Sequence, residues 1–151
     1  MSDILITETI RAAMKAAMKA RDKERLGAIR LMQSEFKRIE VDERIEIDDA
    51  RALVILDKMI KQRRDSAQQY HAAERPELAA REEQEIAVIQ EFLPTQLSTD
   101  ELDAMIDAAI AHAGGTGMQA MGAVMAELKP QLQGRADAGA VSKLVKARLT
   151  A

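Results

Sequence analysis

Side chains able to carry out chemistry are few in this sequence and do not gather into a pattern. Its two histidines, His71 and His112, lie far apart, and the chain contains no cysteine. The absence of cysteine excludes thiolate nucleophiles, disulfides and cysteine–zinc sites. A histidine metal site is not expected, although carboxylates remain able to bind a hard cation. The following serines lack the context of a nucleophile elbow: Ser34, Ser66, Ser98 and Ser142.

Two other patterns fit structural roles better than catalysis. The carboxylate pairs Asp48–Asp49 and Glu82–Glu83 suit helix starts and solvated faces better than a general acid–base pair. The stretch GGTG at 114–117 lacks the lysine and the preceding strand of a phosphate-binding loop. A glycine at positive φ that ends a helix explains it more simply. We therefore expect no catalytic residue, no metal and no cofactor, and no enzyme activity of the chain on its own.

The basic residues of the chain gather near its end. The net charge is −3, but residues 129–151 contain five basic residues and one acid, so this stretch carries about +4. The basic residues are Lys129, Arg135, Lys143, Lys146 and Arg148. A compact basic surface that can contact several phosphates is typical of nucleic-acid binding. Cations also complement the dipole at a helix C-terminus, which would explain the last two residues but not the first two.

Aromatic residues make up only 2% of the chain, and none lies between 93 and 151. Stacking of bases on the end of the chain is therefore not expected, and any recognition would be of backbone and shape, as with structured RNA. The hydrophobic content of 47% comes mainly from aliphatic residues and methionine, which favours packed helices over sheets. The longest apolar run, ALVIL at 52–56, is too short to span a bilayer. No secretory signal is expected, so we predict a cytoplasmic protein.

Helical periodicity predicts about four helices in a domain at 1–94. Asp22 and Asp48 can cap two of them, Pro76 suits the first position of another, and VDERIEI at 41–47 is expected to be a connection. The polar second half of the third helix, including KQRR at 61–64, should project past the core, where a solvated face is favoured over a binding patch. The four helices are expected at about 3–21, from Asp22 through Ile39, from Asp48 to about Ala73, and from Pro76 to about Leu93. Their inward stripes contain Ile6, Ile10, Met14, Ala17, Leu26, Ile29, Met32, Phe36, Ile39, Leu78, Ile86, Ile89, Phe92 and Leu93.

A second domain, at 95–151, begins with LSTDEL at 97–102. Ser98 can cap a helix while Glu101 reaches back to it, as in a capping box. Three helices are expected, at Ser98–Ala113, roughly Met118–Leu128 and roughly Asp137–Leu149, with glycines and Pro130 between them. The last helix should turn Val141, Leu144, Val145 and Leu149 inward and Lys143 and Lys146 away. Met118, Met121 and Met125 are expected to fill the core.

The motifs EFLPTQLSTDEL, MGAVMAELKPQLQGRAD and VSKLVK resemble the GatB/YqeY family. IKQRRDSAQQY followed by AAREEQEIAVI resembles it too, so the resemblance runs from about Ala17 to Leu149. The last 28 residues of that span resemble the tail domain of the B subunit of glutamine-dependent aspartyl/glutamyl-tRNA amidotransferase. The resemblance implies an all-α fold, with a helical N-terminal part and a three-helix tail.

In the amidotransferase, the tail is associated with recognition of the tRNA elbow. The resemblance therefore implies contacts from the turn Gly134–Asp137 and from Lys143 and Lys146. Together with the basic end of the chain, it makes the candidate nucleic-acid-binding residues Lys129, Gly134, Arg135, Lys143, Lys146 and Arg148. This chain lacks the catalytic body of the B subunit, and the DAGA after the turn leaves Arg135 as the main charge there.

Three functions follow as alternatives. The first is a non-catalytic module that binds tRNA, or a complex of tRNA with an amidotransferase or a tRNA synthetase. The second is a protein-interaction scaffold that binds no nucleic acid. The third is an accessory to carbon–nitrogen ligase activity with glutamine as the amido donor.

Overall fold

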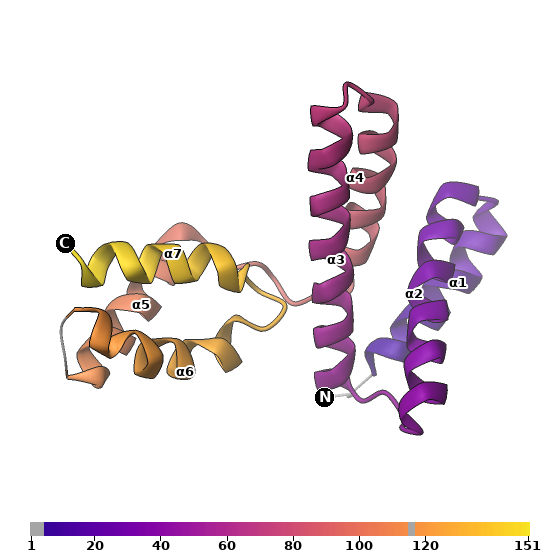
Figure 1. The fold of residues 1–151 in the computed structure, drawn as a ribbon. Coiled ribbons are helices and arrows are strands. Elements are labelled where there is room, and N and C mark those ends of the chain that lie inside the picture. Colours follow the sequence, from indigo (N-terminus) through magenta and orange to yellow (C-terminus); the bar gives the residue numbers. More distant parts are fainter. Residues whose placement is uncertain (1–4, 115–116) are drawn as a thin grey trace. The chain divides into compact units, whose positions relative to one another are not determined.

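The computed structural model describes residues 5–114 and 117–151 of the chain. Within them the fold is all-α, as the sequence predicts, with seven α-helices, one short 3₁₀ helix and no strand (Figure 1). The described residues form two compact units that divide between Leu93 and Pro94. Among the described helices, none combines the length and the apolar character needed to cross a bilayer.

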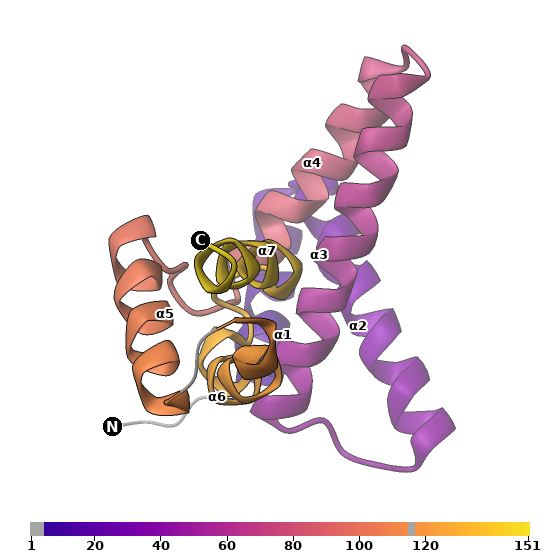
Figure 2. The same ribbon diagram turned by 60° about the vertical axis from the view of Figure 1, so that its left-hand side comes forward.

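The first unit contains α1 (Ile6–Ala20), α2 (Lys23–Glu43), α3 (Asp49–Ala72) and α4 (Pro76–Gln90). α1 packs against α2, and α3 packs along α4 (Figures 1 and 2). The predicted stripes of α1, α2 and α4 supply seven of the fifteen buried core residues, and the apolar first half of α3 supplies five more. The buried members of the core are Ile10, Ala17, Ala28, Ile29, Met32, Phe36, Ile39, Ile47, Ala52, Ile55, Leu56, Met59, Ile60, Val88 and Ile89.

Aspartates fix the starts of three helices in the first unit. The Asp22 and Asp48 side chains accept from the backbone N–H groups of residues three positions later, as predicted. Asp49 does not cap its own helix. Its Oδ1 accepts from the N–H of Ile6 at 2.8 Å and so caps α1, 43 residues earlier. The neighbouring acids therefore serve two different helix starts, which agrees with the structural role predicted for the pair.

The predicted connection at 41–47 is partly wrong, because α2 continues to Glu43. Arg38 explains the extra turn, since its guanidinium donates to Asp42 one turn later and also to Glu35 one turn earlier. The helix ends at Arg44, whose φ of 55° is left-handed. A non-glycine residue therefore closes this helix.

The polar second half of α3 pairs with α4. The α3 members of the core cluster end at Ile60, as the polar pattern predicts. Beyond that point the half-buried Arg63 donates to Glu85 of α4 at 2.8 Å and to the Met59 carbonyl at 3.3 Å. Nearer the tip, His71 and Glu83 form an exposed pair. Arg63 of the KQRR stretch is therefore committed to helix pairing.

The second unit contains α5 (Thr99–Ala113), the 3₁₀ helix η1 (Met118–Ala120), α6 (Met121–Leu132) and α7 (Ala138–Leu149). Ser98 accepts from the Glu101 N–H at 3.1 Å, which is one half of the predicted capping box, and Gly114 ends α5 at a φ of 66°. The other half is wrong, because the Glu101 carboxylate lies near the Arg135 guanidinium and does not bond to the Ser98 N–H. Gly115 and Thr116 lie outside the described residues. The buried core consists of Ile106, Ala109, Ala120, Val124, Leu128, Leu132, Val141, Val145 and Leu149.

Three other predictions for the second unit are wrong. α6 does not stop at Leu128 but runs through Pro130 to Leu132, because burial of the Leu132 side chain holds the last turn in place. Leu144 is not part of the inward stripe of α7 and is 42% exposed. Met118 is 47% exposed, so only Met121 and Met125 pack against the core as predicted.

Candidate nucleic-acid interface

The turn between α6 and α7 consists of Gly134–Asp137, four residues that the sequence analysis singled out. Gly134 is buried and has a φ of 73°, a left-handed conformation that a side chain disfavours. The N–H groups of Arg135 and Ala136 then donate to the Leu132 carbonyl at 2.8 and 3.1 Å, closing the end of α6. Glycine at this position is thus required by the backbone.

Three hydrogen bonds fasten this turn to the beginning of the tail. The Gln96 side-chain amide donates to the Gly134 carbonyl at 2.9 Å, and the Leu97 N–H donates to the Arg135 carbonyl at 2.9 Å. The Arg135 side chain returns the contact, since its Nε donates to the Thr95 carbonyl at 3.1 Å. The motifs TQL and GRAD are therefore two halves of one structure. Sequence reasoning missed this pairing, because nothing local in either motif announces a partner 38 residues away.

Asp137 starts the last helix. Its Oδ1 accepts from the Gly139 N–H at 3.1 Å, so the acid of the turn caps α7. A Cβ added at Gly139 would lie 3.6 Å from that oxygen, which is ordinary van der Waals contact. The cap would therefore tolerate a methyl group at position 139, and the residues that follow Asp137 in DAGA add no charge.

Two of the predicted cations are engaged inside the tail. Arg148 lies on α7 and donates to the carboxylates of Asp103 and Asp107 on α5, and to the Asp103 carbonyl at 3.2 Å. The Arg135 guanidinium also lies 3.8 Å from the Glu101 carboxylate, so Glu101 faces the turn. The positive charges of both arginines are therefore paired with acids of the same unit.

The three lysines are placed differently. Lys129 near the end of α6, and Lys143 and Lys146 on α7, are exposed. None of their ammonium groups forms an ion pair or a hydrogen bond with any residue in the described part of the chain. Val141, Val145 and Leu149 are buried on the opposite side of α7, which directs Lys143 and Lys146 outward together. Of the six candidates, the three lysines are therefore unpaired, whereas Gly134, Arg135 and Arg148 form hydrogen bonds within the tail.

The acidic residues of the tail are mostly engaged as well. Its six acids include Asp103 and Asp107 at Arg148, and Glu101 near Arg135. Asp137 caps α7, and Glu127 contacts His112 at 2.6 Å. Local charge on α6 and α7 is therefore set by the lysines that point into solvent.

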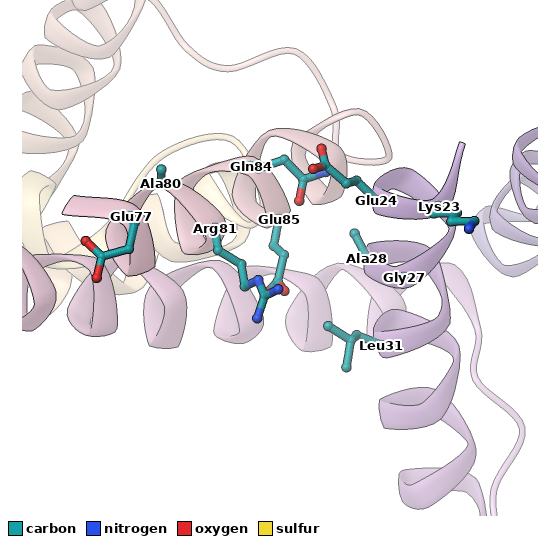
Figure 3. A pocket seen from close by; sticks show the side chains of 10 residues that line it. All are labelled: Lys23, Glu24, Gly27, Ala28, Leu31, Glu77, Ala80, Arg81, Gln84 and Glu85. Atoms are coloured by element: carbon teal, nitrogen blue, oxygen red, sulfur yellow. The ribbon is translucent and has the colours of Figure 1, made fainter. Parts of the chain in front are cut away.

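Another groove, of about 750 Å³, lies in the first unit between α2 and α4 (Figure 3). Its walls carry Lys23 and Arg81 together with the acids Glu24, Glu77 and Glu85, so charges of both signs face it. No group of three or more side chains suited to holding a metal occurs among residues 5–114 and 117–151. Such a mixed lining does not attract a polyanion.

Comparisons with known proteins show which family the chain belongs to. A model of the Yqey-like protein family matches residues 7–149, which include the fastened turn and all six candidates. One relative is "Altered inheritance of mitochondria protein 41, mitochondrial" of Vanderwaltozyma polyspora, 35% identical over 62% of this chain and 52% of its own length. The chain thus spans about half of that relative. A protein of the same name from Pyrenophora tritici-repentis is 25% identical over 94% of this chain and 80% of its own length.

A third relative, an uncharacterised protein of Schizosaccharomyces pombe, is 32% identical over 59% of this chain and 72% of its own length. The family match covers nearly the whole chain, and the resemblance inferred from the motifs is confirmed. The chain belongs to the Yqey-like protein family.

Proposed function

We propose that this protein is a non-catalytic helical module that binds tRNA, or a complex containing tRNA, through its tail unit. The observation that carries the proposal is the pair Lys143 and Lys146, which are exposed, unpaired within the described residues and directed away from the tail core. The kinship of the tail with that of the tRNA amidotransferase B subunit gives the class of ligand.

The geometry of the pair suits phosphates. Residues three apart on an α-helix differ by about 60° around the axis and about 4.5 Å along it, so both ammonium groups can reach one stretch of backbone. With Lys129 the tail offers three free cations. Each neutralised phosphate contributes about 0.7–0.9 to the slope of log K against log salt, so a slope of about −2 to −3 is expected from these contacts alone.

The test is a titration of the full chain with purified, labelled tRNA at four salt concentrations. The double variant Lys143→Glu, Lys146→Glu should weaken binding at least tenfold at low salt and flatten the salt dependence. Both side chains are exposed, so the loss of stability should not exceed about 1 kcal/mol, the size of the helix-dipole effect at Lys146 in the last turn of α7. A salt-independent affinity, or an unchanged affinity in the double variant, would contradict the proposal.

A matched control removes the effect of net charge. Lys61→Glu with Arg64→Glu makes the same charge change on α3, where both side chains are exposed. The control should bind within about twofold of the parent protein, because it changes the net charge by the same amount without altering the proposed tail contacts. Equal losses in the two variants would show a general charge effect and would contradict a tail site.

A second candidate, a protein-docking surface, is favoured by one observation. Leu144 is 42% exposed beside Lys143 on α7, and an exposed leucine next to a lysine fits a partner's apolar and acidic surface. A pulldown with and without nuclease separates the two functions, since only a protein partner survives the treatment. The localisation predicted from the sequence stays a prediction.

A further inference from the structure

Charge is unevenly divided within the first unit. Residues 5–41, which form α1 and most of α2, carry nine basic and five acidic groups, a net charge of about +4. Residues 42–93 carry eight basic and thirteen acidic groups, about −5. The acidic character of the chain therefore lies in α3, α4 and their connections, while the α1–α2 pair is basic.

Most cations of the α1–α2 pair are free. Arg25 is bonded to Glu91, and Arg38 is bonded to Glu35 and Asp42. The other cations are exposed, and their charged groups form no ion pair or hydrogen bond with any residue that the structure describes. These are Arg11, Lys15, Lys19, Arg21, Lys23, Arg30 and Lys37. The pair thus presents more unpaired cations than the tail does.

Two adjoining hollows gather some of these cations. One, of about 240 Å³, lies between α1 and α2 and has Arg11 and Lys37 at its edge. The other, a shallow hollow of about 640 Å³ along α2, includes Arg30. Gln33 and Lys37 line both hollows, so the two lie next to each other. We call the surface made by Arg11, Arg30, Gln33, Ser34 and Lys37 the α1–α2 basic surface.

The acids near this surface do not cancel its charge. Asp42 lines the second hollow but is engaged by Arg38. Glu40 lines the first hollow and is the one acid there against Arg11 and Lys37. The groove between α2 and α4 in Figure 3 differs in this respect, because its three acids outnumber its two cations.

We propose that the α1–α2 basic surface is a second phosphate-backbone site, so that RNA is contacted by the first unit as well as by the tail. This inference takes its class of partner from the proposed function but stands on different residues. Three free cations surround a concave surface that also offers the amide of Gln33 and the hydroxyl of Ser34, the groups that proteins use to contact phosphate oxygens. Arg11, Lys15 and Lys19 recur every four residues, about 6 Å of rise, and extend the charge along α1.

The shape favours RNA over an anionic membrane. A helix that binds a bilayer surface inserts a row of apolar side chains beneath its cations. In α1 that row is turned into the core, where Ile10 and Ala17 are buried. Of the residues lining the second hollow, Val41 is the large exposed apolar one. The charged, amide and hydroxyl side chains among those that line the two hollows can bind a backbone of phosphates and sugars.

The test uses the full chain carrying Arg11→Gln, Arg30→Gln and Lys37→Gln, titrated with labelled tRNA over the same salt series. Losing three phosphate contacts should reduce the magnitude of the salt slope by about 2–3 and weaken binding about 100-fold near 0.1 M salt. The control Lys58→Gln, Lys61→Gln, Arg64→Gln removes three exposed cations from α3 and should leave affinity within about twofold. Charge-preserving swaps, Arg11→Lys, Arg30→Lys and Lys37→Arg, should retain most of the affinity.

The outcomes separate this inference from the proposed tail site. If the tail variant loses affinity for tRNA while the α1–α2 triple variant keeps the affinity of the parent protein, the second site is overturned and the proposed function stands. If the triple variant loses affinity while the tail variant keeps it, the proposed tail site is overturned and the α1–α2 site stands. If the parent protein binds no tRNA at low salt, both proposals fail.

Two further probes decide the class of partner. The parent protein should not bind vesicles containing anionic phospholipid. If it does bind them, and the triple variant does not, the partner is a membrane and the RNA assignment is overturned. Polyglutamate at the charge concentration of the tRNA should compete poorly. Equal competition would replace RNA with an acidic protein as the partner.

Discussion

Arg148 and Asp103, 45 residues apart, join the end of α7 to α5 through two contacts. The Arg148 guanidinium donates to both the carbonyl oxygen and the carboxylate of Asp103. A second carboxylate, from Asp107 one turn later on α5, completes the arrangement. An arginine at the end of a basic helix thus serves as an internal tie, while the lysines beside it remain available.

Arg148→Met should therefore destabilise the tail by about 1 kcal/mol, the upper range for a partly exposed ion pair. The reason is that two carboxylates on α5 lose their shared partner. The loss should shrink in 1 M salt, where charges are screened over about 3 Å. Chemical denaturation measures it, and Lys146→Met is the control, expected within about 0.5 kcal/mol of the parent. Equal effects of the two substitutions would show that Arg148 is no tie.

Two glycines of the tail should respond to alanine with opposite signs. Gly134 has a φ of 73°, so Gly134→Ala should destabilise the tail by about 1–2 kcal/mol. Gly122 lies in α6, and a Cβ added there meets nothing within 4 Å. Gly122→Ala should stabilise it by about 0.5–1 kcal/mol, because alanine loses less backbone entropy in a helix. Thermal unfolding of both variants checks the signs, and a gain in the Gly134 variant would contradict the turn.

Glu35 should stabilise the first unit only when it is charged. The hydrogen bond from Arg38 lowers the pKa of the Glu35 carboxyl, against the effect of its partial burial. A lowered folded-state pKa gives stability that is present above the unfolded pKa of about 4.3 and is lost as pH falls through the folded value. Glu35→Gln should therefore be destabilising at pH 7, and the difference should vanish in acid. Denaturation midpoints measured from pH 7 to pH 3 test this.

Glu82 should show the opposite dependence. Burial raises the pKa of the Glu82 carboxyl, and the neighbouring charge of Glu85 adds to the effect. Its contribution to stability is fully present below the unfolded pKa and is lost as pH rises through the raised folded value. Glu82→Gln should thus be close to neutral at pH 4 and stabilising at pH 7. A destabilised Glu82→Gln protein at pH 7 would show that the charged form is the favoured one.

The fold could be predicted because its signals are local. Helix periodicity, the caps Asp22, Asp48 and Ser98, and the first-turn Pro76 each act within a few residues, and all four appear where expected. The errors arise where a distant contact decides. Spacing allows either Leu144 or Arg148 beside Val141 and Val145, and the two aspartates on α5 favour the arginine. Burial of Leu132 overrides the expectation that Pro130 ends α6.

The candidate site could be predicted only in part for the same reason. The solvent-facing positions of Lys143 and Lys146 follow from the apolar stripe on the opposite side of their helix. The engagement of Arg135 with Thr95 depends on a segment 40 residues earlier, which charge counting cannot see. The α1–α2 basic surface could not be predicted from the net charge of the first domain, because the surplus of acids in residues 42–93 offsets the surplus of cations in residues 5–41.

The hydrogen bond from Ile6 to Asp49 has a consequence for the order in which a ribosome releases the chain. The first N–H of α1 waits for a cap supplied 43 residues later, which is roughly 2–9 s of translation at 5–20 residues per second. The side-chain amide of Gln96 likewise lacks its acceptor, the Gly134 carbonyl, until 38 further residues have been synthesised. The start of each unit therefore gains this hydrogen bond only after about 40 further residues have been synthesised, and a nascent chain interrupted before that point would lack it.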